Sequence, residues 1–190
     1  MKAGVLALQG AFREHREVLD ALGVDAVEVR TPAGLAGLDA LVIPGGESTT
    51  MQRLLTTSGL RPPLEAALAD GLAVLGTCAG AIVLAREVRD GRPDQVPLGV
   101  IDIVARRNAY GRQRDSFEAN LDVAGLPGGP FRGVFIRAPA IDAVGEAVEV
   151  LAEHNGRPVL AREDRVWVTT FHPELAGDLR LHERFLQEVA

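Results

Sequence analysis

Short apolar runs alternate with amphipathic segments through the first half of the chain. The runs have the length of buried strands and lie at residues 4–8, 26–29, 40–43 and 72–76. Apolar residues at helical spacing predict helices between them, at 12–22, 49–55, 63–69 and from Cys78 to about Val88. Strands that alternate with helices are typical of βαβ units. This half therefore predicts a largely parallel sheet.

The second half has a different pattern. Its apolar runs are separated by Gly, Pro and Asn turns, which predicts strands at 100–105, 117–123, 134–136, 148–152, 159–161 and 166–171. Some of these strands are expected to be antiparallel, and an amphipathic helix is expected at 178–189. Residues 91–99 and 124–133 read as loops. The chain as a whole predicts a three-layer α/β fold with a mixed, largely parallel sheet.

Length and composition narrow the function classes. With 190 residues, 47% of them hydrophobic, the chain is expected to form a single domain, 1–190. Its 20 basic and 26 acidic residues give a net charge of −6, which argues against nucleic acid as a partner. No apolar run is long enough for a membrane span and no signal sequence is evident, so we expect a cytoplasmic protein without membrane contact.

Lysine and cysteine usage excludes several chemistries. Lys2 is the one lysine, so the chain has neither a P-loop nor a lysine that could hold pyridoxal phosphate as an internal aldimine. We expect no cofactor. Cys78 is the one cysteine, so an internal disulfide is impossible, and no Cys/His cluster has the spacing of a metal site. We expect no metal.

The strongest chemical signal is the sequence G-T-C-A-G at residues 76–80, between an apolar strand and an Ala-rich helical segment. This pattern fits a nucleophile elbow, in which the central residue occupies a strained turn between small neighbours. A thiol at the start of a helix also favours the thiolate form. The alternative is a buried cysteine in a glycine-rich turn. The strand-to-helix context favours Cys78 as a nucleophile.

A cysteine nucleophile needs a base and an acceptor that orients the base. The motif F-H-P-E supplies both, because His172 and Glu174 lie two residues apart after a strand and project from the same side of an extended chain. The alternative is a strand-end turn with a solvated His and Glu. The other histidines, at positions 15, 154 and 182, are interpreted as structural or surface residues.

A glycine-containing loop follows the predicted strand 40–43. The sequence P-G-G-E-S at 44–48 lies at the strand edge where parallel sheets bind ligands. Gly46 and Ala79 can each present a backbone amide to an oxyanion, and Ser48 or Thr49 is expected to cap the next helix. Glycines at such a junction are often only turn formers, so this loop is weak evidence by itself.

Together these motifs resemble a known family. G-T-C-A-G, P-G-G-E-S-T-T and F-H-P-E-L are similar to the triad class of glutamine amidotransferases, and more closely to the glutaminase subunits of pyridoxal 5′-phosphate synthase. Further motifs of that branch are L-Q-G at 8–10, R-N-A-Y-G-R-Q at 107–113, D-S-F-E at 115–118, V-F-I-R-A-P at 134–139 and E-H-N-G at 153–156. The resemblance covers nearly the whole chain.

The resemblance implies an activity and a set of site residues. It implies glutamine hydrolysis, with Cys78 as nucleophile and His172 and Glu174 as its relay. The glutamine-binding residues that it implies are Gly46, Glu47, Ser48, Arg107, Ile136 and Arg137. A substrate carboxylate suits an arginine, although Arg106 and Arg107 both remain candidates for this contact. The implied partners are L-glutamine and the synthase subunit, to which ammonia is passed.

Two other function classes remain open from the residues. The chain could be a cysteine hydrolase of a related elbow fold, peptidase-like or deglycase-like, which would not account for the loop at 44–48 or the motif at 107–113. It could instead be a redox-sensing module, but a sensor needs no relay and the intact H-P-E argues against it. The arginines at 106, 107, 112 and 114 could suggest RNA binding, which the net charge opposes.

Overall fold

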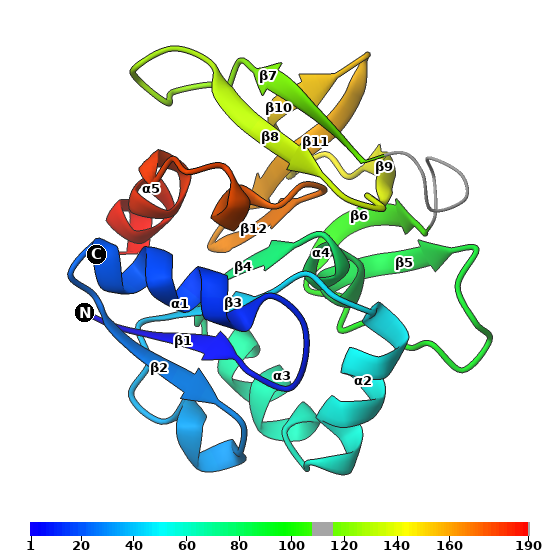
Figure 1. The fold of residues 1–190 in the computed structure, drawn as a ribbon. Helices are drawn as coiled ribbons and strands as arrows, with labels where there is room; N and C mark the ends of the chain where they lie inside the picture. Colours follow the sequence, from blue (N-terminus) through cyan, green and yellow to red (C-terminus); the bar gives the residue numbers. More distant parts are fainter. Residues whose placement is uncertain (108–115, 190) are drawn as a thin grey trace.

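A seven-stranded mixed sheet forms the centre of the molecule in a computed structural model that describes residues 1–107 and 116–189. The strand order is β10-β11-β12-β4-β3-β1-β2 (Figure 1). The strands in chain order are β1 (Lys2–Leu6), β2 (Asp25–Val29), β3 (Ala40–Ile43), β4 (Ala73–Thr77), β10 (Glu149–His154), β11 (Arg157–Glu163) and β12 (Val166–Thr169). Strands β12, β4, β3, β1 and β2 are parallel, whereas β10 and β11 pair antiparallel. The expected mixed, largely parallel sheet is confirmed.

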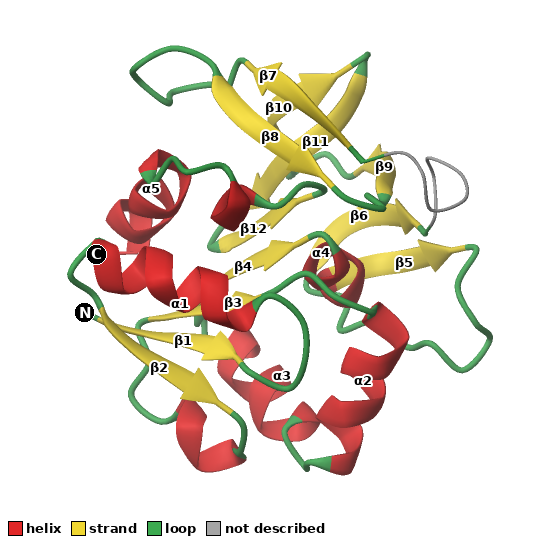
Figure 2. Ribbon diagram, in the orientation of Figure 1, coloured by secondary structure: helices red, strands yellow, loops and turns green. Residues whose placement is uncertain are grey.

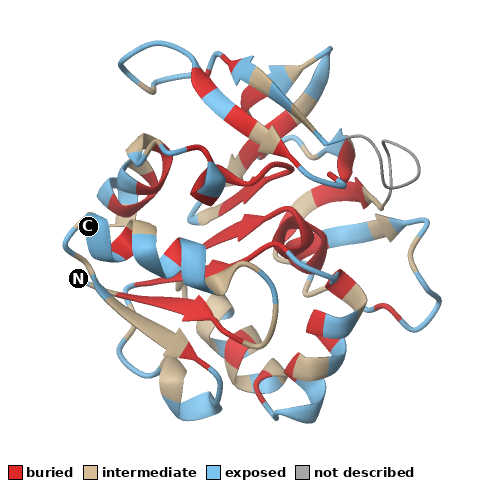
Figure 3. Cartoon of the chain, viewed as in Figure 1, coloured by how far each residue is buried: buried red, intermediate tan, exposed pale blue. Residues whose placement is uncertain are grey.

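Helices cover both faces of this sheet and bury two hydrophobic clusters against it (Figure 2). One cluster includes residues of α1 (Phe12–Ala21) and α5 (Arg180–Val189). The opposite cluster includes residues of α2 (Ser48–Thr57), α3 (Arg61–Ala69) and α4 (Ala79–Leu84). Alternate residues of one strand enter different clusters, as the pleat requires. Central strands are consequently buried on both faces (Figure 3).

Two smaller sheets come mainly from the second half of the chain. Strands β5 (Ala85–Arg89), β6 (Ile101–Arg106) and β9 (Ala140–Val144) form one, and β7 (Phe117–Leu121) pairs antiparallel with β8 (Phe131–Phe135). Two short 3-10 turns, η1 (Pro32–Leu35) and η2 (Pro173–Leu175), complete the elements. Strand β9 was not predicted, and β8 begins inside the stretch 124–133 that reads as a loop.

The predicted helix from Cys78 to about Val88 was wrong in its second half. Helix α4 ends at Leu84, where Ala85 takes up extended dihedral angles of φ −55° and ψ 152°. Residues Ala85–Arg89 then pair in parallel with β6. The five-residue segment A-R-E-V-R is too short to show a clear period, so pairing with β6 decides its conformation.

The carboxyl ends of four parallel strands bring the predicted motifs together. The segment with Gln9 follows β1, the glycine loop follows β3, Cys78 follows β4 and His172 follows β12. Ligands of parallel sheets bind at this edge. Within the ranges 1–107 and 116–189, no helix is both long and apolar enough to cross a membrane.

Candidate active site

Cys78 occupies a strained turn between β4 and α4. Its φ of 49° and ψ of −102° lie in a region that non-glycine residues rarely adopt. Its amide donates to the Thr169 carbonyl at 2.8 Å, which ties the turn to β12. A Cβ on Gly80 would lie only 2.1 Å from the Ile43 carbonyl oxygen, so α4 packs against β3 at a distance that only glycine permits. This is the geometry of the elbow that the sequence predicted.

His172 and Glu174 lie beside the cysteine. His172 Nδ1 is 2.7 Å from Glu174 Oε1, and both residues are buried. A Cβ on Gly45 would lie 2.4 Å from His172 Cε1 and 3.3 Å from Cys78 Cβ. The glycine loop therefore packs directly against both side chains. Pro173 starts the 3-10 turn that places Glu174 beneath the His172 ring.

The charges of this group favour an ionised pair. Burial by itself lowers the pKa of His172, but the hydrogen bonds and charges of Cys78 and Glu174 outweigh it and raise that pKa to about 10. Burial likewise opposes ionisation of Glu174, but the electrostatic interactions with His15 and His172 and the hydrogen bond with His172 lower its pKa well below the usual range. A carboxylate that stays ionised stabilises the imidazolium, and the imidazolium stabilises a thiolate.

Glu47 caps helix α2. Its carboxylate accepts hydrogen bonds from the Thr49 amide at 3.0 Å and from the Thr50 amide at 2.7 Å. Hydrogen bonds from Thr50 and Thr49 outweigh partial burial and lower the pKa of Glu47 to about 2. The expectation that Ser48 or Thr49 caps the helix was wrong, because Glu47 occupies the N-cap position.

The two neighbouring arginines have different partners. Arg107 reaches the glycine loop, where it donates to Glu47 Oε1 at 3.0 Å and to Thr49 Oγ1 at 2.9 Å. Arg106 instead binds Asp142 of β9 at 2.7 Å. Of the two candidates, Arg107 is the one beside the predicted glutamine site.

Gln95 connects Ser48 of the glycine loop with Arg107. The sequence predicts only a loop at this position and no role for Gln95. Its amide nitrogen donates to Ser48 Oγ at 3.0 Å, and its amide oxygen accepts from Arg107 at 3.0 Å. Ser48 is thereby buried, with only 2% of its surface exposed. The Ser48 hydroxyl therefore holds the glycine loop in place and does not face solvent.

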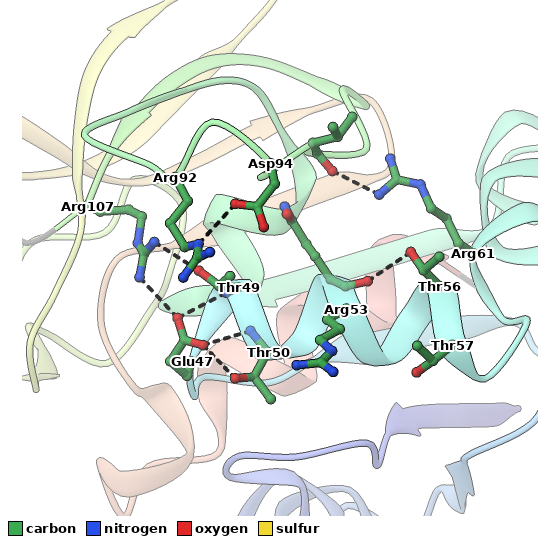
Figure 4. Close-up of a pocket in the computed structure, with 12 residues that line it drawn as sticks. Glu47, Thr49, Thr50, Arg53, Thr56, Thr57, Arg61, Arg92, Asp94 and Arg107 are labelled. Atoms are coloured by element: carbon green, nitrogen blue, oxygen red, sulfur yellow. Dashed lines mark hydrogen bonds and ion pairs between the residues drawn. The ribbon is translucent and has the colours of Figure 1, made fainter.

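A groove of about 840 Å³ extends from Glu47 and Arg107 along α2. Figure 4 shows arginines 53, 61, 92 and 107 around it, with threonines of α2 along one wall. Arg92 pairs with Asp94, and Arg61 donates to the Val96 and Pro97 carbonyls. The groove therefore begins at the predicted glutamine site, and Cys78 is not among the residues that line it.

The remaining predicted residues surround Cys78. Its sulfur lies 3.8 Å from the Ile136 carbonyl oxygen, and Ile136 and Arg137 are exposed next to it. Arg137 has a φ of 48°, so this turn is strained. Ala79 follows Cys78 at the start of α4. Residues 108–113 of the motif that begins at Arg107, together with Arg114 and Asp115, lie outside the described residues.

Gly46 lies against Gln9 of the segment after β1. A Cβ on Gly46 would be 2.5 Å from both amide atoms of Gln9. The Gln9 oxygen accepts the Glu47 amide at 3.1 Å. The direction of the Gly46 amide is thus coupled to Gln9, and its assignment to an oxyanion hole stays a prediction.

Sequence reasoning missed two buried histidines. His15 lies 3.2 Å from Glu174 Oε2 and 2.9 Å from His182, and neither histidine is exposed. The sequence predicts a structural or surface role for each of them and gives no indication of the contact with Glu174. Helical spacing contained the signal, because His15 shares the inward face of α1 with Phe12 and Leu19. Among the residues described, no group of three or more His, Cys, Asp or Glu side chains forms a metal site.

Comparison with known proteins agrees with this geometry. The family model of the SNO glutamine amidotransferase family matches residues 5–190. A relative from Deinococcus radiodurans, described as pyridoxal 5′-phosphate synthase subunit PdxT, is 58% identical over 189 residues, which is 98% of this chain and 96% of the relative. A protein of the same description from Herpetosiphon aurantiacus is 55% identical over 188 residues, 98% of this chain and 99% of that one.

Solved structures share the fold. A crystal structure of a glutamine amidotransferase has a TM-score of 0.93 and 51% identity, and the match covers 100% of this chain and 99% of the other. The structure of PurLQS from Thermotoga maritima has a TM-score of 0.71 at 15% identity, with 99% of this chain and 96% of that chain covered, and so supports the fold alone. Because the family model extends over nearly all of the sequence, the chain belongs to the SNO glutamine amidotransferase family.

Proposed function

We propose that this chain is the glutaminase subunit of a pyridoxal 5′-phosphate synthase and that Cys78, His172 and Glu174 hydrolyse L-glutamine. The observation that carries the proposal is the triad geometry. The thiol lies in an elbow beside a histidine whose far nitrogen is 2.7 Å from a buried carboxylate. The full-length relatives support the pathway, since they are described as subunits of that synthase.

The first half of the reaction releases ammonia. The Cys78 thiolate attacks the side-chain carbonyl carbon of glutamine, and the amides of Gly46 and Ala79 stabilise the oxyanion. When the C–N bond breaks, protonated His172 gives its proton to the leaving nitrogen and a γ-glutamyl thioester remains on Cys78. Glu174 keeps the imidazolium oriented throughout.

The second half regenerates the thiolate. Neutral His172 takes a proton from water, the resulting hydroxide attacks the thioester carbonyl, and the C–S bond breaks to give glutamate. Cys78 leaves as the thiolate and His172 keeps the proton taken from water, which restores the starting ion pair. The γ-carboxylic acid loses its own proton to ammonia or solvent, so atoms and charges balance over one turnover.

Glutamine binding is assigned to the loop residues and the strained turn. Gly46, Glu47 and Ser48 belong to the glycine loop that Arg107 contacts, and Ile136 and Arg137 form the turn beside the Cys78 sulfur. A guanidinium suits the α-carboxylate, and the half-exposed Glu47 carboxylate suits the α-ammonium. Arg107 already pairs with Glu47, so substrate binding must share or exchange that ion pair.

The partner is the synthase subunit, which receives the ammonia before water protonates it. We propose that residues 1–190 act as one glutamine amidotransferase domain, which the family match over 5–190 supports. The cytoplasmic location of the protein stays a prediction.

The test is glutamate formation from L-glutamine by the chain together with its synthase subunit. We expect Cys78→Ala to abolish turnover while retaining fold and glutamine binding, because no other side chain can replace the thiol. Glutamate release by this variant at the wild-type rate would overturn the thioester mechanism. A wild-type chain that cleaves peptides and leaves glutamine intact would identify a different cysteine hydrolase.

A further inference from the structure

The carboxylate of Glu174 is contacted at both of its oxygens. Oε1 faces His172 Nδ1 at 2.7 Å, and Oε2 faces His15 Nε2 at 3.2 Å. The side chains of Glu174 and His15 are both 0% exposed, so bulk solvent does not reach Oε2. The triad accounts only for the contact of Oε1 with His172. The contact of Oε2 comes from α1, where His15 lies 159 positions before Glu174.

The ring of His15 is itself fixed on two sides. Nε2 lies 3.0 Å from the hydroxyl of Thr77, the residue that directly precedes the nucleophile. Nδ1 lies 2.9 Å from His182 Nε2 on α5, and the two rings are 5.2 Å apart between centroids. Glu174, Thr77 and His182 thus hold one imidazole from three different elements, η2, β4 and α5.

The direction of the proton follows from the acceptors. His15 Nε2 makes its hydrogen bond with the Thr77 hydroxyl, whereas its 3.2 Å approach to Glu174 Oε2 is an electrostatic contact without hydrogen-bond geometry. An ionised carboxylate at this distance favours the form of His15 that carries a proton on Nε2, so the positive end of the N–H group lies beside Oε2. This holds whether His15 Nδ1 accepts from His182 or donates to it. Desolvation lowers the pKa of His182 to about 3, so His182 is neutral and supports the ring of His15 without adding charge.

We propose that His15 is a positioning residue for the triad, whose Nε2–H holds Glu174 ionised and aimed at His172. The proposal rests on the proposed function of Cys78, His172 and Glu174. His15 touches neither substrate nor sulfur in this role. It acts through Glu174, with His182 and Thr77 fixing its ring.

Loss of this donor has a definite chemical consequence. Without it, Oε2 of Glu174 is a buried carboxylate oxygen with no positive group beside it, which disfavours the ionised form and lets the carboxylate rotate. A Glu174 carboxylate that is less fully ionised or poorly oriented stabilises the His172 imidazolium less well. The Cys78 thiolate then forms only at higher pH. Turnover falls, while the glutamine-binding loop is untouched.

The test compares His15→Phe, which keeps an aromatic ring without a donor, with His15→Gln, whose amide can still donate. For the chain with its synthase subunit, we expect His15→Phe to lower kcat roughly ten- to a hundredfold, the range expected when a buried charged group loses a polar contact, with KM little changed. His15→Gln should recover most of this loss. Leu19→Val, one turn along the same buried face of α1, is the matched control for loosened packing and should keep wild-type kcat.

A second readout does not depend on turnover. Cys78 is the one cysteine of the chain, so the pH dependence of its alkylation by iodoacetamide reports thiolate formation without interference. We expect the midpoint to move up by about one pH unit in His15→Phe and to return in His15→Gln. Circular dichroism checks that each variant is folded, and His15→Met replaces His15→Phe if the phenyl ring is not accommodated.

The outcomes separate this inference from the proposed function. A folded His15→Phe with wild-type kcat and an unchanged alkylation midpoint overturns the role of His15, provided that Glu174→Gln is inactive. Equal losses in His15→Phe, His15→Gln and Leu19→Val would assign His15 to packing alone and also overturn it. A wild-type chain whose glutaminase activity survives complete alkylation would instead contradict the triad itself.

Discussion

At the residue scale, the buried Glu174 side chain controls the ionisation of its catalytic neighbour. Its carboxylate is held between His172 and His15 in a site that excludes water. Interactions with the two histidines keep the pKa of Glu174 low in spite of burial, and the same carboxylate helps to raise the pKa of His172 to about 10. Each group therefore depends on the charge of the next.

We expect Glu174→Gln to reduce kcat by about three to four orders of magnitude, as loss of the orienting carboxylate does in related triads, with little change in KM. The glutamine side chain is neutral. Its NH₂ group must face either His172 or His15, and each of these rings already directs an N–H group toward that position. Steady-state glutamate formation measures the effect. Glu17→Gln, on the exposed side of α1, removes the same charge and should be active; a rise in KM alone would place Glu174 in the binding pocket.

At the scale of elements, the site depends on how closely short segments pack. Helix α4 has only six residues and lies directly on β3, while α2 starts at the glycine loop and is capped by Glu47. The strained turns at Cys78 and Arg137 face each other across the sulfur. Small changes in these contacts should affect stability and activity together.

Gly80 tests the packing of α4. In Gly80→Ala the new Cβ would lie 2.1 Å from the Ile43 carbonyl oxygen, so backbone must move. We expect a loss of about 1–3 kcal/mol in the free energy of unfolding, measured by denaturant titration, and a large loss of glutaminase activity because the elbow shifts. Gly34→Ala, whose Cβ would meet its nearest neighbour at 3.4 Å, should be nearly neutral. Equal stability of the two variants would contradict this account.

Glu47 tests the cap of α2. Glu47→Ala removes the acceptor of the Thr49 and Thr50 amides and should cost about 1 kcal/mol of unfolding free energy at neutral pH. Because folding lowers the pKa of Glu47 from 4.5 to about 2, its contribution is present above pH 4.5 and is lost as the pH falls toward 2. The stability difference between wild type and variant should therefore narrow on acidification. A difference independent of pH would mean that the cap acts without its charge.

On the scale of the whole molecule, the sheet edge places four segments around one sulfur. Gln9 from the end of β1 contacts Gly46 and accepts the Glu47 amide at 3.1 Å. The position of the proposed oxyanion hole is thus linked to a segment at the rim of the site. A partner that docks there has a direct way to turn the Gly46 amide.

We expect the free chain to be a poor glutaminase and the synthase subunit to raise its turnover at least about tenfold, which corresponds to about 1.4 kcal/mol of the barrier. This is less than one full oxyanion-hole contact. Glutamate formation with and without the synthase subunit measures the ratio. Equal activities would refute gating by the partner but leave the triad assignment unaffected.

The sequence pattern alone predicted the features that depend on residues close together in the chain. The flanking glycines and the strand-to-helix context predicted the turn at Cys78, and the spacing of two residues predicted that His172 and Glu174 lie together. The alternation of strands and helices predicted the parallel part of the sheet. At the Cys78 turn and in the His172–Glu174 pair, the residues that interact belong to one element or to the turn beside it.

Only the tertiary structure decided which elements meet. His15 and Glu174 are far apart in sequence, and their contact depends on the packing of α1 against η2. The same holds for Arg107 at the glycine loop, Arg106 on Asp142, and Ala85–Arg89 as a strand on β6. Periodicity tells which side of its own helix or strand a residue occupies, but it carries no information about what packs against that side.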